Sequence, residues 1–246
     1  MSAINLPPSP EARDTSFRNL GLIRFKEAWD IQEELFQSIV SIKMGNRNLP
    51  PSEKEVAPNY LLFCEHPHVY TLGKSGSEDN LLINPVQLQA NDAEFIPINR
   101  GGDVTYHGPG QIVAYPILNL DVFVRGVREY IHLLEETVIT MLKQYGINGS
   151  RLEHATGVWL DPYTPGRARK ICAIGVRTSR WVSMHGLALN INTNLAYFNH
   201  INPCGFTDKT VTSLQQELGR EIPMEEAKHH LKQAFARVFG MTSLDL

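Results

Sequence analysis

The chain has 246 residues, 42% of them hydrophobic, and a formal net charge of -3. Such a chain can bury a sizeable core, and its balance of charge argues against a nucleic-acid-binding protein, which is usually strongly basic. Its three cysteines are too few and too scattered for a disulfide framework. No apolar run approaches the roughly 20 residues of a membrane span. We therefore expect a soluble, cytoplasmic protein.

The first residues carry no sign of a targeting segment. Residues 1–19 include three prolines and two acidic side chains. They lack the apolar block of a signal peptide and the arginine-rich, acid-poor composition of a transit peptide. We expect a flexible N-terminal segment over 1–19, followed by a single domain over 20–246.

Hydrophobic periodicity then predicts strands and helices in irregular succession. Helices are expected over 26–44, 127–145 and 223–239, the last two ending at Gly146 and Gly240. Shorter runs predict strands over 21–25, 60–64, 69–72, 95–99, 104–107, 111–120, 157–160, 170–176 and 181–191, with a loop over 45–59. Because strands outnumber helices and do not alternate with them regularly, we predict an α+β fold with a mixed sheet, not a doubly wound parallel sheet.

Residues 100–111 hold four glycines and a proline within twelve positions. Glycine allows the backbone to approach a ligand closely, Arg100 could pair with an anion, and Tyr106 offers an apolar wall with a polar tip. The run lacks the ending of a Walker loop, and it opens a strand where the dinucleotide fingerprint opens a helix. The residues alone leave two readings open, a ligand-binding loop and an ordinary glycine-rich hairpin.

Cys204 stands in the turn-like run Asn202-Pro203-Cys204-Gly205. Pro203 presets one backbone angle, and Gly205 relieves the steric demand after the thiol. Cysteine is a strong nucleophile once a neighbour keeps it as thiolate. The setting therefore suggests a cysteine held out for chemistry.

Four stretches of the chain closely resemble the signature segments of the lipoyl(octanoyl) transferase family: 100–111, 169–177, 185–190 and 202–205. They occur in the family's order, and the resemblance covers most of the chain, from about residue 21 to 240. The resemblance implies the catalytic fold of biotin and lipoate protein ligases, with a mixed sheet flanked by helices and a smaller sheet. It implies transfer of an octanoyl group from octanoyl-acyl carrier protein to a lysine of lipoyl domains, through a cysteine thioester. This is the first step of protein lipoylation from endogenous octanoate.

The resemblance also implies the site and its partners. Cys204 and Lys170 are the expected catalytic residues. The expected substrate-binding residues are Arg100, Gly101, Gly102, Asp103, Val104, Thr105, Tyr106, His107, Ala173, Ile174, Gly175, Gly186, Leu187 and Ala188. The acceptors would be lipoyl domains of 2-oxoacid dehydrogenase E2 subunits and the glycine cleavage H protein. We expect no cofactor, no metal, no nucleic acid and no membrane as partners.

Lys170 suits the expected chemistry. As an ammonium it would stabilise the Cys204 thiolate, and as an amine it could deprotonate the incoming lysine. Because strand side chains alternate, Lys170, Cys172 and Ile174 should share one face of their strand.

Other titratable residues have simpler interpretations. His107 and His185 could act as bases, but we expect structural hydrogen bonds. The spacing of Cys64, His66 and His68 hints at a metal site, although a strand edge with half-exposed histidines is the simpler reading. We expect Cys172 to be a buried apolar residue. His229 and His230, with Lys228 and Lys232, should form a solvated helix face.

Residues 151–180 carry six basic side chains against two acidic ones. We expect a basic rim that would steer an acidic carrier protein toward the site, with an ordinary solvated loop as the alternative. Three further functions remain open: an ATP-dependent lipoate or biotin ligase of the same fold, a thiol hydrolase using Cys204 with a histidine, and a non-catalytic acyl-binding module.

Overall fold

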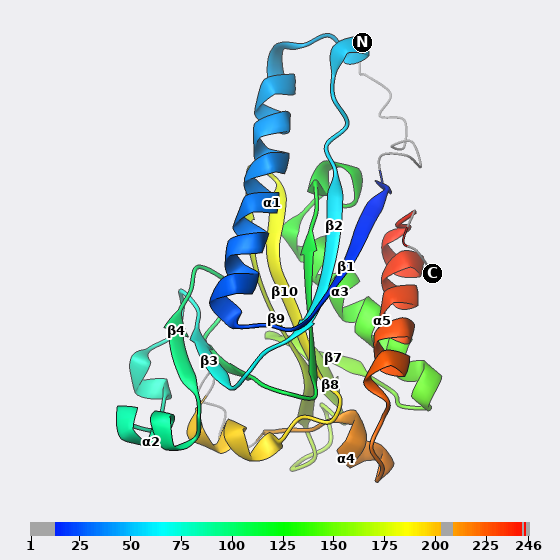
Figure 1. Cartoon of the computed structure of the whole chain (residues 1–246). Helices are drawn as coiled ribbons and strands as arrows, with labels where there is room; N and C mark the ends of the chain where they lie inside the picture. The colour runs from blue at the N-terminus through cyan, green and yellow to red at the C-terminus, as the bar shows by residue number, and fades with distance from the viewer. Residues whose placement is uncertain (1–12, 203–208, 243, 245–246) are drawn as a thin grey trace.

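The computed structural model describes residues 13–202, 209–242 and 244, and Figure 1 shows the arrangement of their elements. The strands are β1 (Thr15–Leu22), β2 (Asn59–Glu65), β3 (Val69–Leu72), β4 (Glu94–Pro97), β5 (Val104–His107), β6 (Gln111–Ile117), β7 (Ser150–Leu152), β8 (Ala155–Leu160), β9 (Arg169–Ser179), β10 (Val182–Asn190) and β11 (Thr210–Val211). The α-helices are α1 (Phe25–Gly45), α2 (Pro85–Ala90), α3 (Val127–Leu142), α4 (Leu214–Leu218) and α5 (Met224–Phe239). None of these helices is both long and apolar enough to cross a membrane.

The described strands form two sheets. The main, eight-stranded sheet has the order β1-β2-β6-β10-β9-β8-β7, with β11 paired to β9 beside this path. β1 lies parallel to β2 and β11 parallel to β9, whereas β6, β10 and β9 pair antiparallel. A three-stranded sheet of order β4-β3-β5 lies at the lower left in Figure 1. The predicted α+β fold with a mixed sheet and a smaller sheet is confirmed.

Both faces of the main sheet are buried, because helices cover each of them (Figure 1). Along β2, Leu61 and Phe63 pack into the core under α3 and α5, while Leu62 and Cys64 pack into the core under α1. This alternation is the expected result of the strand period of two. The two faces of the main sheet thus carry separate clusters of core side chains.

Each predicted helix and strand has a counterpart in the structure, but the first strand lies earlier in the chain than predicted. β3, β5 and the helix over 26–44 appear at or within one residue of their expected bounds. The first strand is wrong: it covers Thr15–Leu22, and Phe25 already begins α1. Thr15 is buried and its amide donates to the Thr242 carbonyl at 3.0 Å. Residues 15–19 therefore lie in a strand of the main sheet, although the sequence predicts a flexible segment there.

Candidate active site

A cavity of about 730 Å³ lies between the main sheet and the small sheet. It brings together three of the segments that the sequence singled out. The predicted residues that line it are Lys170, Arg100, Gly102, Asp103, Val104, Thr105, His107, Ala173, Ile174, Gly175, Gly186, Leu187 and Ala188. These residues come from positions 100 to 188 of the chain, so only the fold makes them neighbours.

Two predicted binding residues, Gly101 and Tyr106, do not line the cavity. The Gly101 amide donates to the Val176 carbonyl at 2.9 Å and ties the glycine-rich loop to β9. Tyr106 is fully buried in the core of the small sheet, where its ring stacks on Tyr197 and its hydroxyl bonds His68 Nδ1 at 2.8 Å. The expectation that Tyr106 forms a wall for the ligand is therefore not supported by its position.

Gly186 shows why the segment 185–190 needs a glycine. A Cβ atom there would lie 2.1 Å from the Ala114 carbonyl oxygen and 2.7 Å from Pro116 Cδ. A side chain at this position would collide with the backbone of β6 before it could narrow the cavity. Ala173 and Ala188, which pair across β9 and β10, both line the cavity and are better placed to limit its length.

Arg100 is buried, and its guanidinium binds the chain itself. One terminal nitrogen donates to the Thr71 carbonyl at 2.9 Å and to Thr71 Oγ1 at 3.0 Å, and the other donates to the Gly101 carbonyl at 3.0 Å. Its aliphatic stem lies against Gly175 of β9. Arg100 thus connects the glycine-rich loop, the small sheet and β9, and it contributes positive charge to the cavity wall.

His107 and His185 line the cavity as neutral imidazoles. Burial lowers the pKa of each to about 3. His107 Nδ1 lies 2.8 Å from Gln111 Oε1, and the Gln111 amide nitrogen donates to Asn190 Oδ1, so the ring nitrogen is the donor. A general base works best with a pKa near the working pH. The geometry therefore favours hydrogen-bonding roles for both histidines.

Cys64, His66 and His68 each have partners within the fold. His66 Nδ1 donates to the Ile23 carbonyl at 2.7 Å, so its Nε2 accepts from the Tyr115 hydroxyl at 2.7 Å. His66 is fully buried, and burial lowers its pKa to about 4. The expectation of half-exposed histidines on a strand edge is wrong for His66, because His66 is fully buried directly after β2, which lies between β1 and β6. Among the residues that the structure describes, no group of three acidic, histidine or cysteine side chains could hold a metal.

Lys170 lies on β9 at the wall of the cavity. Its Nζ stands 4.7 Å from the centroid of the Trp159 ring, a cation–π contact, and donates to the Thr156 carbonyl at 3.2 Å. Trp159 also lines the cavity. The ammonium group is thus held on the β8 side of the cavity by an aromatic face and a backbone oxygen.

A bulge in β9 determines which way Lys170 points. Val158 pairs with Cys172, but the next residue, Trp159, pairs with Lys170, so Ile171 is an extra residue. Ile171 and Cys172 both pack in the core under α3 and α5, whereas Lys170 lines the cavity. The predicted common face of Lys170 and Cys172 is wrong, because the bulge interrupts the alternation. Cys172 is fully buried, as expected.

Cys204 lies outside the described residues, but both flanks of its segment are described. Asn202 and Lys209 both line the cavity. The Asn202 amide donates to the Asn80 carbonyl at 2.9 Å. On the other side, Thr210 and Val211 form β11 and pair with Arg169 and Lys170. The described residues on either side of the Cys204 segment, Asn202 and Lys209, thus both lie on the cavity wall, and β11 after Lys209 pairs with Lys170.

The basic segment 151–180 is largely neutralised by the chain's own carboxylates. Three arginines form ion pairs at 2.6 to 3.1 Å: Arg151 with Glu135 and Glu136, Arg169 with Asp161 and Glu217, and Arg177 with Glu33. Arg167 and Arg180 are the more exposed members. The net positive rim is therefore smaller than the count of residues predicted.

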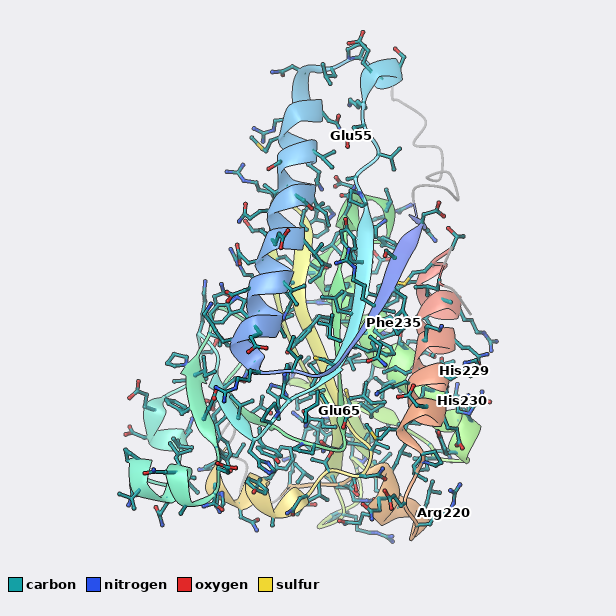
Figure 2. All side chains as sticks on the ribbon, in the orientation of Figure 1. Glu55, Glu65, Arg220, His229, His230 and Phe235 are labelled. Atoms are coloured by element: carbon teal, nitrogen blue, oxygen red, sulfur yellow. The ribbon has the colours of Figure 1, made fainter. Side chains whose placement is uncertain are left out.

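The helix face expected to be solvated is only partly so. Figure 2 shows His229 and His230 on α5, away from the small sheet. His229 is exposed, but the ring of His230 packs edge-on against the ring of Tyr145, with the two ring centroids 5.6 Å apart. Lys228 is buried, and its Nζ lies 2.8 Å from Glu225 and 3.5 Å from Glu65. Lys228 thus secures α5 to the lower end of β2.

The sequence prediction missed the β8 wall of the cavity, formed by Thr156 and Trp159. One signal was present: Gly157 interrupts a strand-like run, and glycine within a strand often marks a close approach of backbones. A Cβ at Gly157 would lie 2.5 Å from the Cys172 carbonyl oxygen, and its φ of 125° falls in the region that favours glycine.

Comparisons with known proteins identify the family of the chain. Residues 25–236 match the lipoyl protein ligase A/B catalytic domain. An octanoyltransferase of Bacteroides thetaiotaomicron is 56% identical over 219 residues, covering 89% of this chain and 92% of its own. An octanoyltransferase of Christiangramia forsetii is 54% identical over 228 residues, covering 92% of this chain and 96% of its own.

Two solved structures share the fold at low identity. A bi-partite lipoate protein ligase from Thermoplasma acidophilum has a TM-score of 0.64 at 12% identity, covering 93% of this chain and 84% of its own. Lipoate-protein ligase A bound with ATP also has a TM-score of 0.64 at 12% identity, with 93% and 85% covered. The class is thus that of lipoyl protein ligase catalytic domains.

Within that class, the chain belongs to the lipoyl(octanoyl) transferase family, as its sequence resemblance predicted. It is an acyltransferase.

Proposed function

We propose that this acyltransferase moves an octanoyl group from octanoyl-acyl carrier protein to a lysine of a lipoyl domain, through a thioester on Cys204. The names of its relatives support octanoyl as the group transferred. The Thermoplasma ligase was solved as part of a lipoylation system with its E2 lipoyl domain, which supports lipoyl domains as acceptors.

One observation carries the proposal: Lys170 and both flanks of the Cys204 segment line the same cavity. From Lys170, the cavity continues along β9 past Ala173 to Gly175. The five residue-to-residue steps from Lys170 to Gly175 span roughly 15 Å of strand, and an extended eight-carbon chain is shorter than this. Burying such a chain yields about 0.8 kcal/mol per methylene, less the cost of ordering it.

The proposed reaction consists of two acyl transfers. The Cys204 thiolate attacks the carrier thioester, the carbon–sulfur bond to the carrier breaks, and the carrier thiolate takes a proton from the Lys170 ammonium. The neutral amine of the acceptor lysine then attacks the enzyme thioester, and the Cys204 thiolate leaves. The amine loses one proton to Lys170, which restores the ammonium. The products are an octanoyl amide and the free carrier thiol.

The other two cysteines are poor candidates for the nucleophile. Cys64 and Cys172 are fully buried, and burial raises the pKa of both thiols above its usual range. They are therefore protonated at neutral pH, and the thiolate is the reactive form.

The test is the intact mass of the protein after mixing with octanoyl-acyl carrier protein without ATP. We expect one octanoyl adduct in the wild type and in Cys64→Ala, none in Cys204→Ala, and loss of the adduct when a lipoyl domain is added. Free octanoate without transfer would indicate a thiol hydrolase. An adduct that requires octanoate and ATP would indicate a ligase.

A further inference from the structure

A buried carboxylate on the far face of the main sheet is connected to Lys170. Glu135 of α3 is 8% exposed, and its Oε1 accepts a hydrogen bond from the Gly157 amide at 3.1 Å. The carbonyl of the same peptide group, that of Thr156, accepts from Lys170 Nζ at 3.2 Å. A single peptide group therefore stands between the Glu135 carboxylate and the Lys170 ammonium.

The direction of this contact is favourable to both charges. In a trans peptide the N–H and C=O point in opposite directions, so the N–H faces the anion and the C=O faces the cation. A hydrogen bond to a charged partner is stronger than a neutral one and polarises the group that makes it. Glu135 thus increases the electron density on the oxygen that accepts the hydrogen bond from Lys170 Nζ.

Gly157 allows this peptide group to lie close to β9. Gly157 has a φ of 125°, and a Cβ there would meet the Cys172 carbonyl oxygen at 2.5 Å and Lys170 Cδ at 3.5 Å. The two charges also act on a common neighbour: at Cys172, whose pKa is raised mainly by burial, Lys170 lowers the pKa and Glu135 raises it.

We infer that Glu135 is a positioning residue that acts on Lys170 through the Thr156–Gly157 peptide, holding the ammonium in place and favouring its charged form. This inference rests on the proposed function only in taking Lys170 as the group that transfers protons. Glu135 touches no substrate, since it lies on the α3 side of the sheet.

The chain provides a matched control. Arg151 pairs with Glu135 at 3.1 Å and with the neighbouring Glu136 at 2.7 Å. Glu136→Gln removes a carboxylate from the same arginine and leaves the acceptor of the Gly157 amide intact. The other charged or titratable groups on the cavity wall or on β9 are unchanged in both variants: Arg100, Asp103, His107, Tyr115, His154, Arg169, Cys172, Arg177, His185 and Lys209.

The experiment is trace labelling of the full-length protein with acetic anhydride from pH 7 to 11, with Lys170 followed by peptide mass spectrometry. All variants carry Cys204→Ala, so that the titration of Lys170 is not shared with a thiol. In Glu135→Gln we expect the apparent pKa of Lys170 to fall by about one pH unit and its labelling at pH 8 to rise several-fold. Glu136→Gln should match the parent.

Arg151→Gln provides a test of opposite sign. Removing the cation beside Glu135 should raise the apparent pKa of Lys170 and slow its labelling. Equal shifts in Glu135→Gln and Glu136→Gln, or no shift in Glu135→Gln, would overturn the inference. If Glu135→Gln does not fold, an unchanged or lower pKa in Arg151→Gln overturns it. Because no substrate is used, these outcomes are independent of whether octanoyl transfer is the reaction.

Discussion

Two walls of the cavity differ in the charge of their titratable side chains. The histidine wall, formed by His107 and His185, is buried and holds neutral imidazoles whose pKa values lie near 3. The lysine wall, formed by Lys170, Thr156 and Trp159, holds an ammonium between an aromatic face and a backbone oxygen. The difference suggests that the two walls have different roles. A wall without ionised imidazoles suits an apolar acyl chain, and a wall that keeps one cation suits the transfer of charge.

The largest effect should follow from removing the cation of the lysine wall. We expect Lys170→Ala to lower kcat about a hundred- to ten-thousandfold, the range typical of general acid–base groups. Lys170→Arg keeps the charge but cannot release a proton. It should keep much of the Cys204 reactivity toward iodoacetamide at neutral pH while kcat stays low. If Lys170→Arg turned over at the wild-type rate, Lys170 would not transfer protons and only its electrostatic role would remain.

Substitutions at Gly186 and Ala173 should have different effects: the first should lower stability, and the second should change the preferred length of the acyl chain. Gly186→Val should destabilise the fold by about 3 kcal/mol, because its side chain would meet the Ala114 carbonyl. Ala173→Leu should change the free energy of unfolding by less than about 1 kcal/mol and shift the acyl preference from octanoyl toward hexanoyl. Urea unfolding and competition between the two donors measure these outcomes. A stable Gly186→Val enzyme that preferred a shorter acyl chain would mean that position 186, and not position 173, limits the length of the chain.

The histidine wall should make the fold sensitive to acid. The folded pKa of His107 and of His185 lies below the unfolded value of about 6.5, so the unfolded chain binds more protons as the pH falls. Stability is then full above pH 6.5 and is lost as the pH falls toward 3, by about 2 kcal/mol per imidazole between pH 7 and 5.

Urea unfolding at pH 7 and pH 5 measures this loss. His107→Gln should reduce the difference between the two pH values, whereas His229→Gln, on an exposed side chain, should not. An identical pH difference in the wild type and in His107→Gln would mean that this imidazole is not buried neutral.

The smallest effects are expected at the exposed arginines. Arg180→Gln should change stability by less than about 0.5 kcal/mol and kcat/KM for octanoyl-acyl carrier protein by less than about twofold. Arg169→Gln should cost more, because Arg169 joins β9 to Glu217 of α4 at 2.6 Å. If Arg180→Gln alone markedly reduced the salt dependence of kcat/KM for octanoyl-acyl carrier protein, this result would support the basic steering rim that the sequence predicted.

Much of this protein follows from its sequence. Hydrophobic periods placed α1, β3 and β5, because their apolar patterns are strong. The sequence also provided the motifs that contain Lys170 and the glycine-rich loop, although only the fold brings them to one cavity. Local chemistry located the helix ends at Gly146 and Gly240.

Tertiary structure decided the rest, for identifiable reasons. Alternation could not show that Lys170 leaves the face of Cys172, because the bulge at Ile171 exists only in the pairing of β9 with β8. A count of charges could not show that Arg151, Arg169 and Arg177 are paired, since their partners come from distant helices and loops. The contact of Glu135 with the peptide beside Lys170 likewise joins α3 to β8 across the sheet. Such contacts depend on register and on packing between elements, neither of which is written in the order of residues along one strand.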